Sequence, residues 1–352
     1  MCQTEYCVLS GGAGDEALLK RAGAIIRAGG LVAFPTETVY GLGGNALEGS
    51  SSEKIYRAKG RPSDNPLIVH IADMESLGPI VKEIPERAKR LAERFWPGPL
   101  TMIFKKSELV PYETTGGLDT VAVRMPSPLS ILDFIRYSGG YVAAPSANLS
   151  GRPSPTRAEH VREDLEGRID MILDQGPVGI GVESTIVDLT GSVPVLLRPG
   201  FIGPEQLKEV LGELEYDPAM TGILPDGTRP KAPGMKYKHY APKGELYIVR
   251  GEAGAVTKRI NELTKEAQAQ GFRTAVLATS ERAGGYCCSH VVSVGSRADE
   301  GEIARNLFEV LRSFDTEHID RIYSEELDTP VLGMAIMNRL IKAAAHRVIR
   351  AE

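Results

Sequence analysis

Cationic, hydroxyl and amide side chains stand beside short apolar runs at several places in this sequence. Lys59 and Arg61 lie in a loop rich in glycine and proline, and Asn65 follows them just before the apolar run at 67–71. Ser146 and Asn148 follow another apolar run at 141–144. Ammonium and guanidinium groups bind phosphates and carboxylates, and hydroxyl and amide groups add hydrogen bonds. In an open α/β sheet, such groups at strand ends form an anion-binding crevice.

Two arginines are harder to explain as surface charges. Arg124 and Arg198 each close an apolar run, VAVR and VLLR, so each guanidinium emerges from a strand that is expected to be buried. A cation in that position needs an anionic partner. Thr120 begins the first of these runs, and Ser184 follows a glycine-rich loop. Together these residues predict a site for a nucleoside triphosphate and a carboxylate ligand.

Each of these residues also has an ordinary structural explanation. A single lysine or arginine is usually a solvated surface charge, and Asn148 could bond its own backbone in a turn. His70, at the end of an apolar run, is more often a structural histidine than a general base. The sequence contains no GxxxxGK[ST], HExxH or GxSxG motif and no zinc-ligand spacing. A P-loop, a metalloprotease and a serine hydrolase are therefore not indicated, and no residue is predicted to ligate a metal.

Composition sets the class of protein. The chain has 352 residues, of which 42% are hydrophobic and 25% charged, which is ordinary for a globular protein and leaves room for two domains. Its net charge of −5 does not favour bulk nucleic-acid binding. No apolar run approaches the roughly 18 residues of a membrane span, and the first residues do not resemble a signal peptide. We therefore expect a cytoplasmic protein without a membrane partner.

The four cysteines give no disulfide framework and no CxxC pair. The vicinal pair Cys287–Cys288 could be redox-active, although incidental free thiols are the commoner explanation.

Helices and short strands alternate up to residue 216. Helices are expected at 15–28, with Asp15 as the N-cap, and at 52–59, 86–95, 129–137 and 205–211. Strands are expected at 31–34, 67–71, 100–104, 120–124, 141–144, 171–174, 184–188 and 193–198. The mixture of hairpin-like and crossover connections predicts an α+β domain at 1–216 with an open, twisted, mixed sheet.

Residues 217–244 are rich in proline and glycine and are expected to form an interdomain linker without regular structure. The basic and aromatic cluster at 236–240, KYKHY, favours a segment that folds back over a site as a lid. From 245 to 352, strands at 245–249, 274–278, 290–294 and 319–323 alternate with helices at 255–270, 302–314 and 332–350. This pattern predicts a small, doubly wound, Rossmann-like α/β domain.

Seven motifs, in the order in which they occur, resemble those of the YrdC-like threonylcarbamoyl-AMP synthases: PTETVYGLG, KIYRAKGRPSDNPL, WPGPLT, VAVRMP, APSANLSGRPSPT, GVESTIVD and LLRPG. APGMKYKHYAP, followed by an α/β unit, resembles the longer, two-domain form of that family. The resemblance covers residues from about 20 to 244. It implies a YrdC-like domain with a concave, positively charged cleft, followed by a Rossmann-like domain.

The activity implied by the resemblance is synthesis of L-threonylcarbamoyladenylate and pyrophosphate from L-threonine, bicarbonate and ATP. The product serves the formation of N6-threonylcarbamoyladenosine at position 37 of tRNA. Mg²⁺ is expected to arrive with ATP. A downstream tRNA threonylcarbamoyl transferase is expected to receive the adenylate, so that contact with tRNA itself would be indirect.

The resemblance also implies roles for individual residues. Lys59 and Arg61 would be catalytic by neutralising the phosphates, with Ser146 and Asn148 facing them across the cleft. The residues implied to bind ATP are Lys59, Arg61, Asn65, Thr120, Ser146, Asn148, Ser154, Arg198 and Tyr240. Those implied to hold threonine are Thr36, His70, Arg124, Ala144 and Ser184, with Arg124 as the partner of the carboxylate.

Two other classes of protein remain as alternatives. One is a module that binds double-stranded RNA or tRNA in the cationic cleft, against which the net charge counts. The other is a carbamoyl-phosphate-using transferase like the hydrogenase maturation factors, which contain a YrdC-like domain. Those proteins need additional zinc-finger and acylphosphatase segments, and this chain has no zinc-ligand spacing. A regulatory role for the second domain also stays open.

Overall fold

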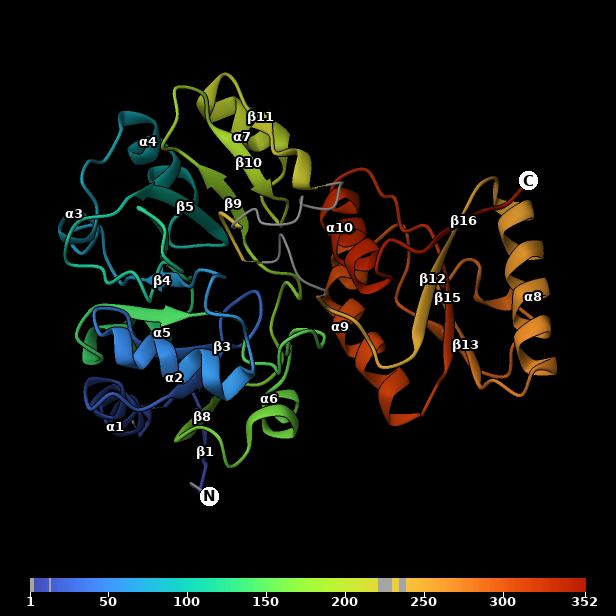
Figure 1. The fold of residues 1–352 in the computed structure, drawn as a ribbon, viewed down its shortest axis with the longest axis horizontal. Coiled ribbons are helices and arrows are strands. Elements are labelled where there is room, and N and C mark those ends of the chain that lie inside the picture. Colours follow the sequence, from blue (N-terminus) through green and yellow to red (C-terminus); the bar gives the residue numbers. More distant parts are fainter. Residues whose placement is uncertain (1–2, 13, 221–229, 234–238) are drawn as a thin grey trace. The chain divides into compact units, whose positions relative to one another are not determined.

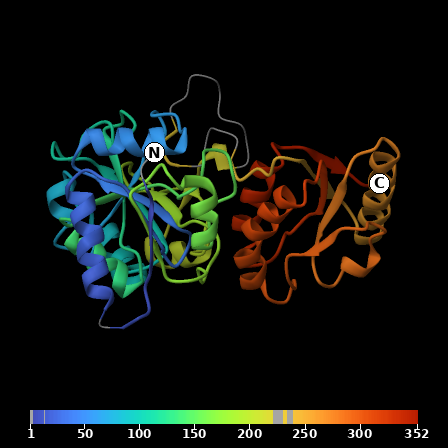
Figure 2. The same cartoon turned by 90° about the horizontal axis from the view of Figure 1, so that it is seen from below.

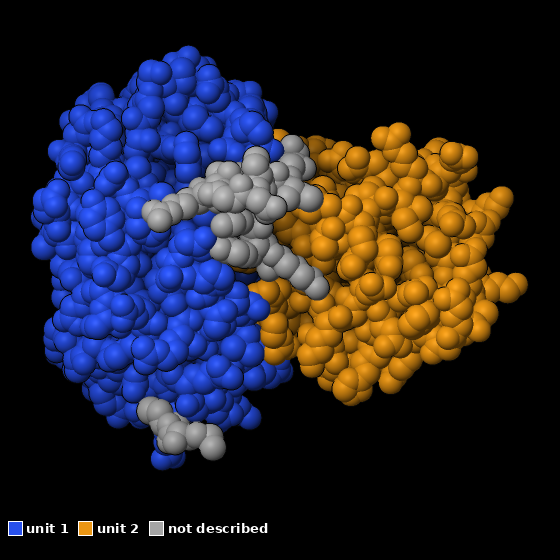
Figure 3. Space-filling model, viewed as in Figure 1, with its two compact units in different colours: residues 1–150, 154–179, 183–236 blue, residues 151–153, 180–182, 237–352 orange. Residues whose placement is uncertain are grey.

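The computed structural model describes residues 3–12, 14–220, 230–233 and 239–352 (Figure 1). The chain divides into two compact units (Figure 3). Unit 1 comprises residues 1–150, 154–179 and 183–236, and unit 2 comprises residues 151–153, 180–182 and 237–352. The predicted boundaries at 216 and 244 stay predictions, because the division between the units falls inside the predicted linker.

Unit 1 is built on one mixed sheet, and its strand order is β1-β8-β2-β3-β7-β4-β6-β5-β9-β10-β11. Parallel pairs such as β4 with β6 alternate with antiparallel pairs such as β5 with β6, so the predicted mixed sheet is confirmed. The strands are β1 (Glu5–Val8), β2 (Val32–Phe34), β3 (Gly41–Asn45), β4 (Ile68–His70), β5 (Leu100–Lys105), β6 (Thr120–Arg124), β7 (Val142–Ala144), β8 (Met171–Asp174), β9 (Thr185–Asp188), β10 (Val195–Arg198) and β11 (Glu215–Tyr216).

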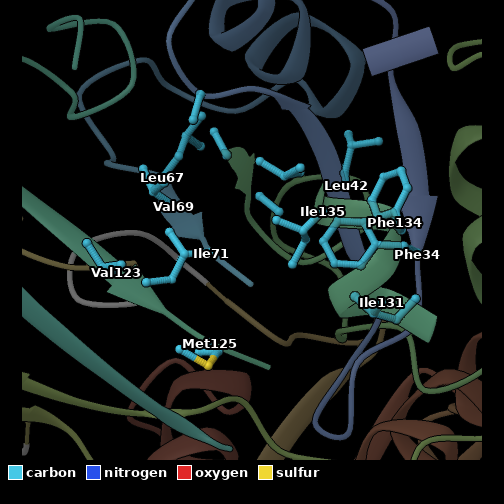
Figure 4. Packing of buried hydrophobic residues seen from close by; sticks show 14 of the residues in the cluster. Phe34, Leu42, Leu67, Val69, Ile71, Val123, Met125, Ile131, Phe134 and Ile135 are labelled. Atoms are coloured by element: carbon cyan, nitrogen blue, oxygen red, sulfur yellow. The ribbon is translucent and has the colours of Figure 1, made fainter. Parts of the chain in front are cut away.

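The helices of unit 1 bury apolar stripes against this sheet. In α4, Ala88, Leu91, Ala92 and Phe95 are buried at the i, i+3, i+4, i+7 spacing of an amphipathic helix. Figure 4 shows part of the resulting core, in which the rings of Phe34 and Phe134 lie 5.3 Å apart. The helices are α1 (Asp15–Arg27), α2 (Gly49–Lys59), α3 (Leu77–Ile80), α4 (Glu86–Phe95), α5 (Leu129–Tyr137), α6 (Ala158–Leu165) and α7 (Pro204–Leu211).

One face of the sheet carries a second, smaller apolar cluster across β4, β6, β5, β9 and β10. It contains strand residues that alternate with those of the main core, such as Ile68 beside Val69 and Ala122 beside Val123. Ala219 and Ala232, from the predicted linker, are buried in this cluster. These two parts of the linker therefore pack on this face, and the first includes one turn of 3-10 helix, η1 (Pro218–Met220), where no regular structure was expected.

Several local predictions were correct and others were not. The helices at 86–95 and 129–137 and the strand at 120–124 have the predicted bounds. Asp15 does not cap α1: its carboxylate accepts the backbone N–H groups of Ser10 and Gly11 and so holds the preceding turn. Strand β3 was missed because its sequence, GLGGN, has no β-propensity.

Unit 2 contains a parallel sheet with the strand order β14-β13-β15-β12-β16. Helix α8 covers one face, and α9 and α10 cover the other (Figures 1 and 2). This arrangement confirms the predicted Rossmann-like architecture. The elements are β12 (Glu245–Arg250), α8 (Ala253–Ala269), β13 (Thr274–Ala278), η2 (Ala283–Gly285), β14 (Val291–Ser293), α9 (Glu300–Thr316), β15 (Arg321–Glu325), α10 (Gly333–Ala343) and β16 (Val348–Arg350).

The helix predicted to run to residue 350 is wrong at its C-terminal end. Helix α10 ends at Ala343, and the chain then returns to the sheet as β16. Ala345 and His346 have positive φ values of 49° and 61°, which lie outside the right-handed helical region. The chain reverses at these two residues without a glycine or proline. The usual sequence signal for the end of a helix is therefore absent.

Among the described residues, no helix combines the length and the apolar character needed to cross a membrane. The predicted cytoplasmic location stays a prediction.

Candidate active site

The register of the sheet brings three polar side chains into one row. His70 on β4 pairs with Arg124 on β6, and Arg124 pairs with Thr101 on β5. Side chains two residues apart on a strand share a face, so this row lies on the face that carries Ile68 and Ala122. Ala219 and Ala232 of the predicted linker are buried on the same face.

Arg124 is the centre of the row. Its side chain is only 5% exposed, its Nη1 donates to Thr38 Oγ1 at 2.9 Å, and its Nε donates to the Gly98 carbonyl at 3.4 Å. Its Nη2 lies 2.7 Å from Glu37 Oε1, although this ion pair does not have hydrogen-bond geometry. The second oxygen of Glu37 accepts the Ser127 N–H at 3.2 Å. An arginine and a glutamate thus lie side by side, nearly removed from water.

A short turn after β2 carries Glu37 and Thr38 to this position. Thr36 Oγ1 donates to the Val39 carbonyl at 2.7 Å and accepts the Thr38 N–H at 3.1 Å. Since the Thr36 proton is used in this way, Thr38 Oγ1 donates to Thr36 across their 2.9 Å contact and keeps a lone pair for Arg124. The predicted ligand residue Thr36 therefore closes the turn, and Thr38 is the hydroxyl that contacts Arg124.

His70 is neutral in this environment. Burial, and after it the positive charge of Arg124, lower the pKa of His70 to about 3. Its Nδ1 lies 3.1 Å from the Ile68 carbonyl, and its ring packs edge-on against Phe34. A neutral imidazole at the end of β4 can exchange hydrogen bonds with a ligand without adding charge.

Ser184 and Arg198 extend the site beyond Thr101. Ser184 Oγ lies 2.7 Å from Thr101 Oγ1 and accepts from Arg198 Nη2 at 3.1 Å. Arg198 Nε also donates to the Ser184 carbonyl at 3.0 Å, and its Nη1 donates to the Pro233 carbonyl at 3.4 Å. Ser184, which was predicted to bind threonine, is thus hydrogen-bonded to Arg198, which was predicted to bind ATP. Arg198 in turn is hydrogen-bonded to Pro233 of the linker.

A second cluster contains Lys59, Ser146 and Asn148. Lys59 is 2% exposed, and its ammonium donates to the backbone carbonyls of Ser146 and Asn148, both at 2.5 Å. Ser146 Oγ donates to Asn148 Oδ1 at 2.6 Å. The sequence led us to expect Ser146 and Asn148 across a cleft from Lys59, whereas the structure has them in direct contact.

Arg61 lies just after α2, in a chain reversal that needs glycine. Gly60 ends the helix with φ of +62° and leads directly to Arg61. The Arg61 guanidinium donates to the carbonyls of Asn65 and Pro66 at 3.3 and 3.1 Å. Asn65 is 1% exposed, and within the described residues its Oδ1 has no hydrogen-bond partner. A buried amide oxygen in that state is suited to accept from a ligand.

The remaining predicted site residues are dispersed. Ser154 is buried and donates to Glu183 Oε1 at 2.5 Å. Thr120 begins β6 and shares the face of Ala122, but it lies at the strand end opposite to Arg124. Ala144 ends β7 beside Ile68, which leaves its backbone near the site face. Tyr240 belongs to unit 2, where it has φ of +63° and its ring stacks on Phe308 at 5.1 Å.

Sequence reasoning missed four polar residues of the site: Glu37, Thr38, Thr101 and Glu183. Thr101 had a usable signal, because it is a polar residue in an otherwise apolar strand, LTMIF. The other three lie in loops, where only the folded chain shows which side chain turns inward. The lysines and tyrosine at 236–238 of the predicted lid cluster lie outside the described residues.

A Mg²⁺ ion would need oxygen ligands, usually including carboxylates. The described residues contain no group of three or more histidine, cysteine, aspartate or glutamate side chains placed to hold a metal. Glu37 is paired with Arg124, and Glu183 is bonded to Ser154. These residues do not fit a metal site made by the protein alone.

Two family models match the chain. Residues 24–200 match the family described as "Telomere recombination", and residues 202–345 match the family described as "Threonylcarbamoyl-AMP synthase, C-terminal domain". The threonylcarbamoyl-AMP synthases of Pyrococcus abyssi and Bacillus subtilis are each 50% identical to it. Both alignments cover 96% of this chain, with 96% of the first relative and 95% of the second.

Solved structures agree with these matches. The crystal structure of P. abyssi Sua5 complexed with L-threonine is 48% identical in sequence and superposes with a TM-score of 0.92 over 99% of each chain. A variant of the same protein has a TM-score of 0.93, covering 99% of this chain and 98% of that one. The chain belongs to the threonylcarbamoyl-AMP synthase family, in its two-domain form.

Proposed function

We propose that this protein is an L-threonylcarbamoyladenylate synthase, a nucleotidyltransferase that converts L-threonine, bicarbonate and ATP into threonylcarbamoyl-AMP and pyrophosphate. The product would supply the threonylcarbamoyl group of N6-threonylcarbamoyladenosine at position 37 of tRNA. The observation that carries this proposal is the buried guanidinium of Arg124, set among hydroxyl groups and a neutral histidine on one face of the sheet. That arrangement suits a small, hydroxylated carboxylic acid.

In this proposal Arg124 binds the carboxylate of threonine, because a buried arginine gives a strong, charge-assisted hydrogen bond. The hydroxyl of Ser184 lies on one side of Arg124, and His70 lies on the other. A neutral His70 can pair with the threonine hydroxyl. Thr36 and the backbone of Ala144 complete the proposed threonine subsite by shaping its walls.

ATP would lie against the second cluster and the loops beside it. The proposed nucleotide residues are Lys59, Arg61, Asn65, Thr120, Ser146, Asn148, Ser154, Arg198 and Tyr240. Lys59 and Arg61 would neutralise charge as the carbamate oxygen attacks the α-phosphorus and pyrophosphate departs. Such a displacement depends on alignment and charge neutralisation more than on a strong base. Residues 217–244, with Tyr240, would act as a lid over the nucleotide.

Mg²⁺ would enter as the complex with ATP, held by the phosphates. Because the described residues do not provide a set of carboxylates for it, we assign no step of the reaction to the ion. The labile adenylate would pass to a tRNA threonylcarbamoyl transferase, so that tRNA would be an indirect partner.

The test is pyrophosphate release from ATP and Mg²⁺, with L-threonine and bicarbonate omitted in turn. Release that requires both substrates supports the proposal. Release that ignores threonine would indicate a nucleotide hydrolase. No release, combined with salt-dependent binding of double-stranded RNA or tRNA, would favour the RNA-binding alternative.

A further inference from the structure

We propose that Glu37 receives the ammonium group of the substrate amino acid and takes up its proton before carbamate formation. This inference rests on the proposed function, since it assigns a new role within the threonine subsite. It starts from the placement of opposite charges: Glu37 Oε1 lies 2.7 Å from Arg124 Nη2, and the two side chains are 13% and 5% exposed.

This pair has the charge pattern of an α-amino acid in reverse. A free α-amino acid carries its carboxylate and its ammonium group on the same carbon atom, so a receptor for both needs a cation and an anion close together. Arg124 supplies the cation, and Glu37 supplies the anion. A carboxylic acid without an amino group would gain nothing from the second charge, and it would suffer repulsion from it.

Arg124 does not need Glu37 for its orientation. Its Nη1 donates to Thr38 and its Nε donates to the Gly98 carbonyl, which together fix the plane of the guanidinium. The contact with Glu37 lacks hydrogen-bond geometry at both Oε1 and Nη2. Burying a charge is costly unless its hydrogen bonds are made. Oε1 is thus held near Arg124, with Oε2 fixed by Ser127 N–H, in a state that a ligand N–H would complete.

The other buried groups of the site do not compete for this role. His70 is neutral, because burial and, after it, the positive charge of Arg124 lower its pKa to about 3, so it offers no negative charge to an ammonium group. Glu183 Oε1 already accepts a hydrogen bond from the Ser154 hydroxyl at 2.5 Å. Lys59 is a cation whose ammonium is enclosed by two carbonyls. Glu37 is the carboxylate adjacent to the proposed carboxylate partner.

The chemistry requires such an acceptor. Threonine carries R–NH₃⁺, which has no lone pair for attack on carbon. Transfer of one proton to the Glu37 carboxylate gives R–NH₂ and a carboxylic acid. The amine then forms an N–C bond with bicarbonate, and water leaves, which yields the carbamate R–NH–COO⁻. The carbamate oxygen next bonds to the α-phosphorus of ATP, and the bond to pyrophosphate breaks. Glu37 returns its proton to solvent when the product leaves.

The experiment compares two ligands that differ only in the amino group: L-threonine and 3-hydroxybutanoate. Their affinities are measured by calorimetry, without ATP, on the full chain and on the Glu37→Gln variant, which keeps the size and an acceptor oxygen for Ser127. We expect the variant to bind L-threonine more weakly by a factor on the order of 10 to 100, the effect of one charged hydrogen bond. Its affinity for 3-hydroxybutanoate should be unchanged or higher.

Two outcomes overturn the inference in different ways. If the variant loses the same factor for both ligands, Glu37 only positions Arg124, and the proposed function stands without this role. If the unaltered protein binds no L-threonine, the proposed function fails as well. A Glu37→Asp variant, which keeps the charge, is a second test in case the Glu37→Gln variant misfolds. It should retain part of the preference for L-threonine over 3-hydroxybutanoate. If Glu37→Asp and Glu37→Gln lose this preference equally, the negative charge of residue 37 is not its cause, which also contradicts the inference.

Discussion

Replacing Gly200 with alanine should damage the threonine subsite through the backbone. Gly200 comes two residues after Arg198, at the point where the chain passes the loop that carries Ser184. A Cβ atom on Gly200 would lie 2.7 Å from the Glu183 carbonyl oxygen and from Ser184 C, and closer still to the Thr185 nitrogen. All three are backbone atoms, which cannot swing aside as the end of a side chain can. The loop or the end of β10 must therefore move.

The cost of such overpacking is about 1–3 kcal/mol. In a unit of this size, each kcal/mol shifts the unfolding midpoint by about 2–4 °C, so the midpoint of unit 1 should fall by roughly 2–12 °C. Because Ser184 is bonded to Thr101 and to Arg198, its displacement should also raise the KM for threonine more than the KM for ATP. Thermal unfolding followed by circular dichroism and steady-state pyrophosphate release measure the two effects.

The matched control is Gly78→Ala in α3, where a Cβ would meet no atom within 4 Å. There the extra methyl group should leave the protein unchanged or stabilise it by up to about 1 kcal/mol. The reasoning would be refuted if Gly200→Ala kept both the midpoint and the threonine KM of the unaltered protein. It would also be refuted if Gly78→Ala and Gly200→Ala behaved alike.

Four further predictions follow from the site. Arg61→Ala and Arg124→Ala should each abolish threonylcarbamoyl-AMP formation with a retained circular dichroism spectrum, and turnover near the original rate in either would contradict the assignment. Ser184→Ala should raise the threonine KM, because Arg198 loses an acceptor and threonine a hydroxyl, whereas an unchanged KM would place Ser184 outside the subsite. His70 has its pKa lowered from 6.5 to about 3 by folding, so its contribution to stability is complete above about pH 6.5 and is lost as the pH falls toward 3. The stability of the original protein relative to His70→Gln should thus decrease by up to about 1.4 kcal/mol per pH unit in that window, and denaturant titrations that give a pH-independent difference would disprove it. Chelation of Mg²⁺ should stop pyrophosphate release and leave threonine binding intact in calorimetry; persistent release would remove the ion from the proposal.

The sequence predicted those elements whose hydrophobic period was clear. The stripe in α4 and the alternation in β6 gave correct bounds, because burial on one face leaves a regular pattern in the sequence. Strand β3 had no such pattern, because it consists mainly of glycine, which has a low β-propensity. Its glycines allow neighbouring side chains to pack closely against the strand. A Cβ on Gly43 would lie 2.8 Å from the Val142 side chain and 3.0 Å from Phe34. Only the assembled sheet reveals that requirement.

The site was predictable at its strand ends and not in its loops. Arg124 and Arg198 could be recognised because each is a cation at the end of an apolar strand. Thr101 could be recognised because it is a polar residue within one. The partner of Arg124 could not be found in this way, because the hydrogen bond to Thr38 joins residues 86 positions apart in the sequence. Contacts of that kind depend on how a turn crosses the face of the sheet. Local pattern in the chain contains no information on that path.

One feature of the strands explains why the site can be both buried and charged. The period of two places Val69 and Val123 in the helix-covered core, and it places His70 and Arg124 on the opposite face beside Ile68 and Ala122. That apolar floor lowers the local dielectric, which strengthens every charged interaction of Arg124 and keeps His70 neutral. The same floor makes an uncompensated guanidinium expensive, so Arg124 requires Glu37 when threonine is absent. Substrate binding would then exchange an internal ion pair for two external ones, and the affinity for threonine should depend on both charges together.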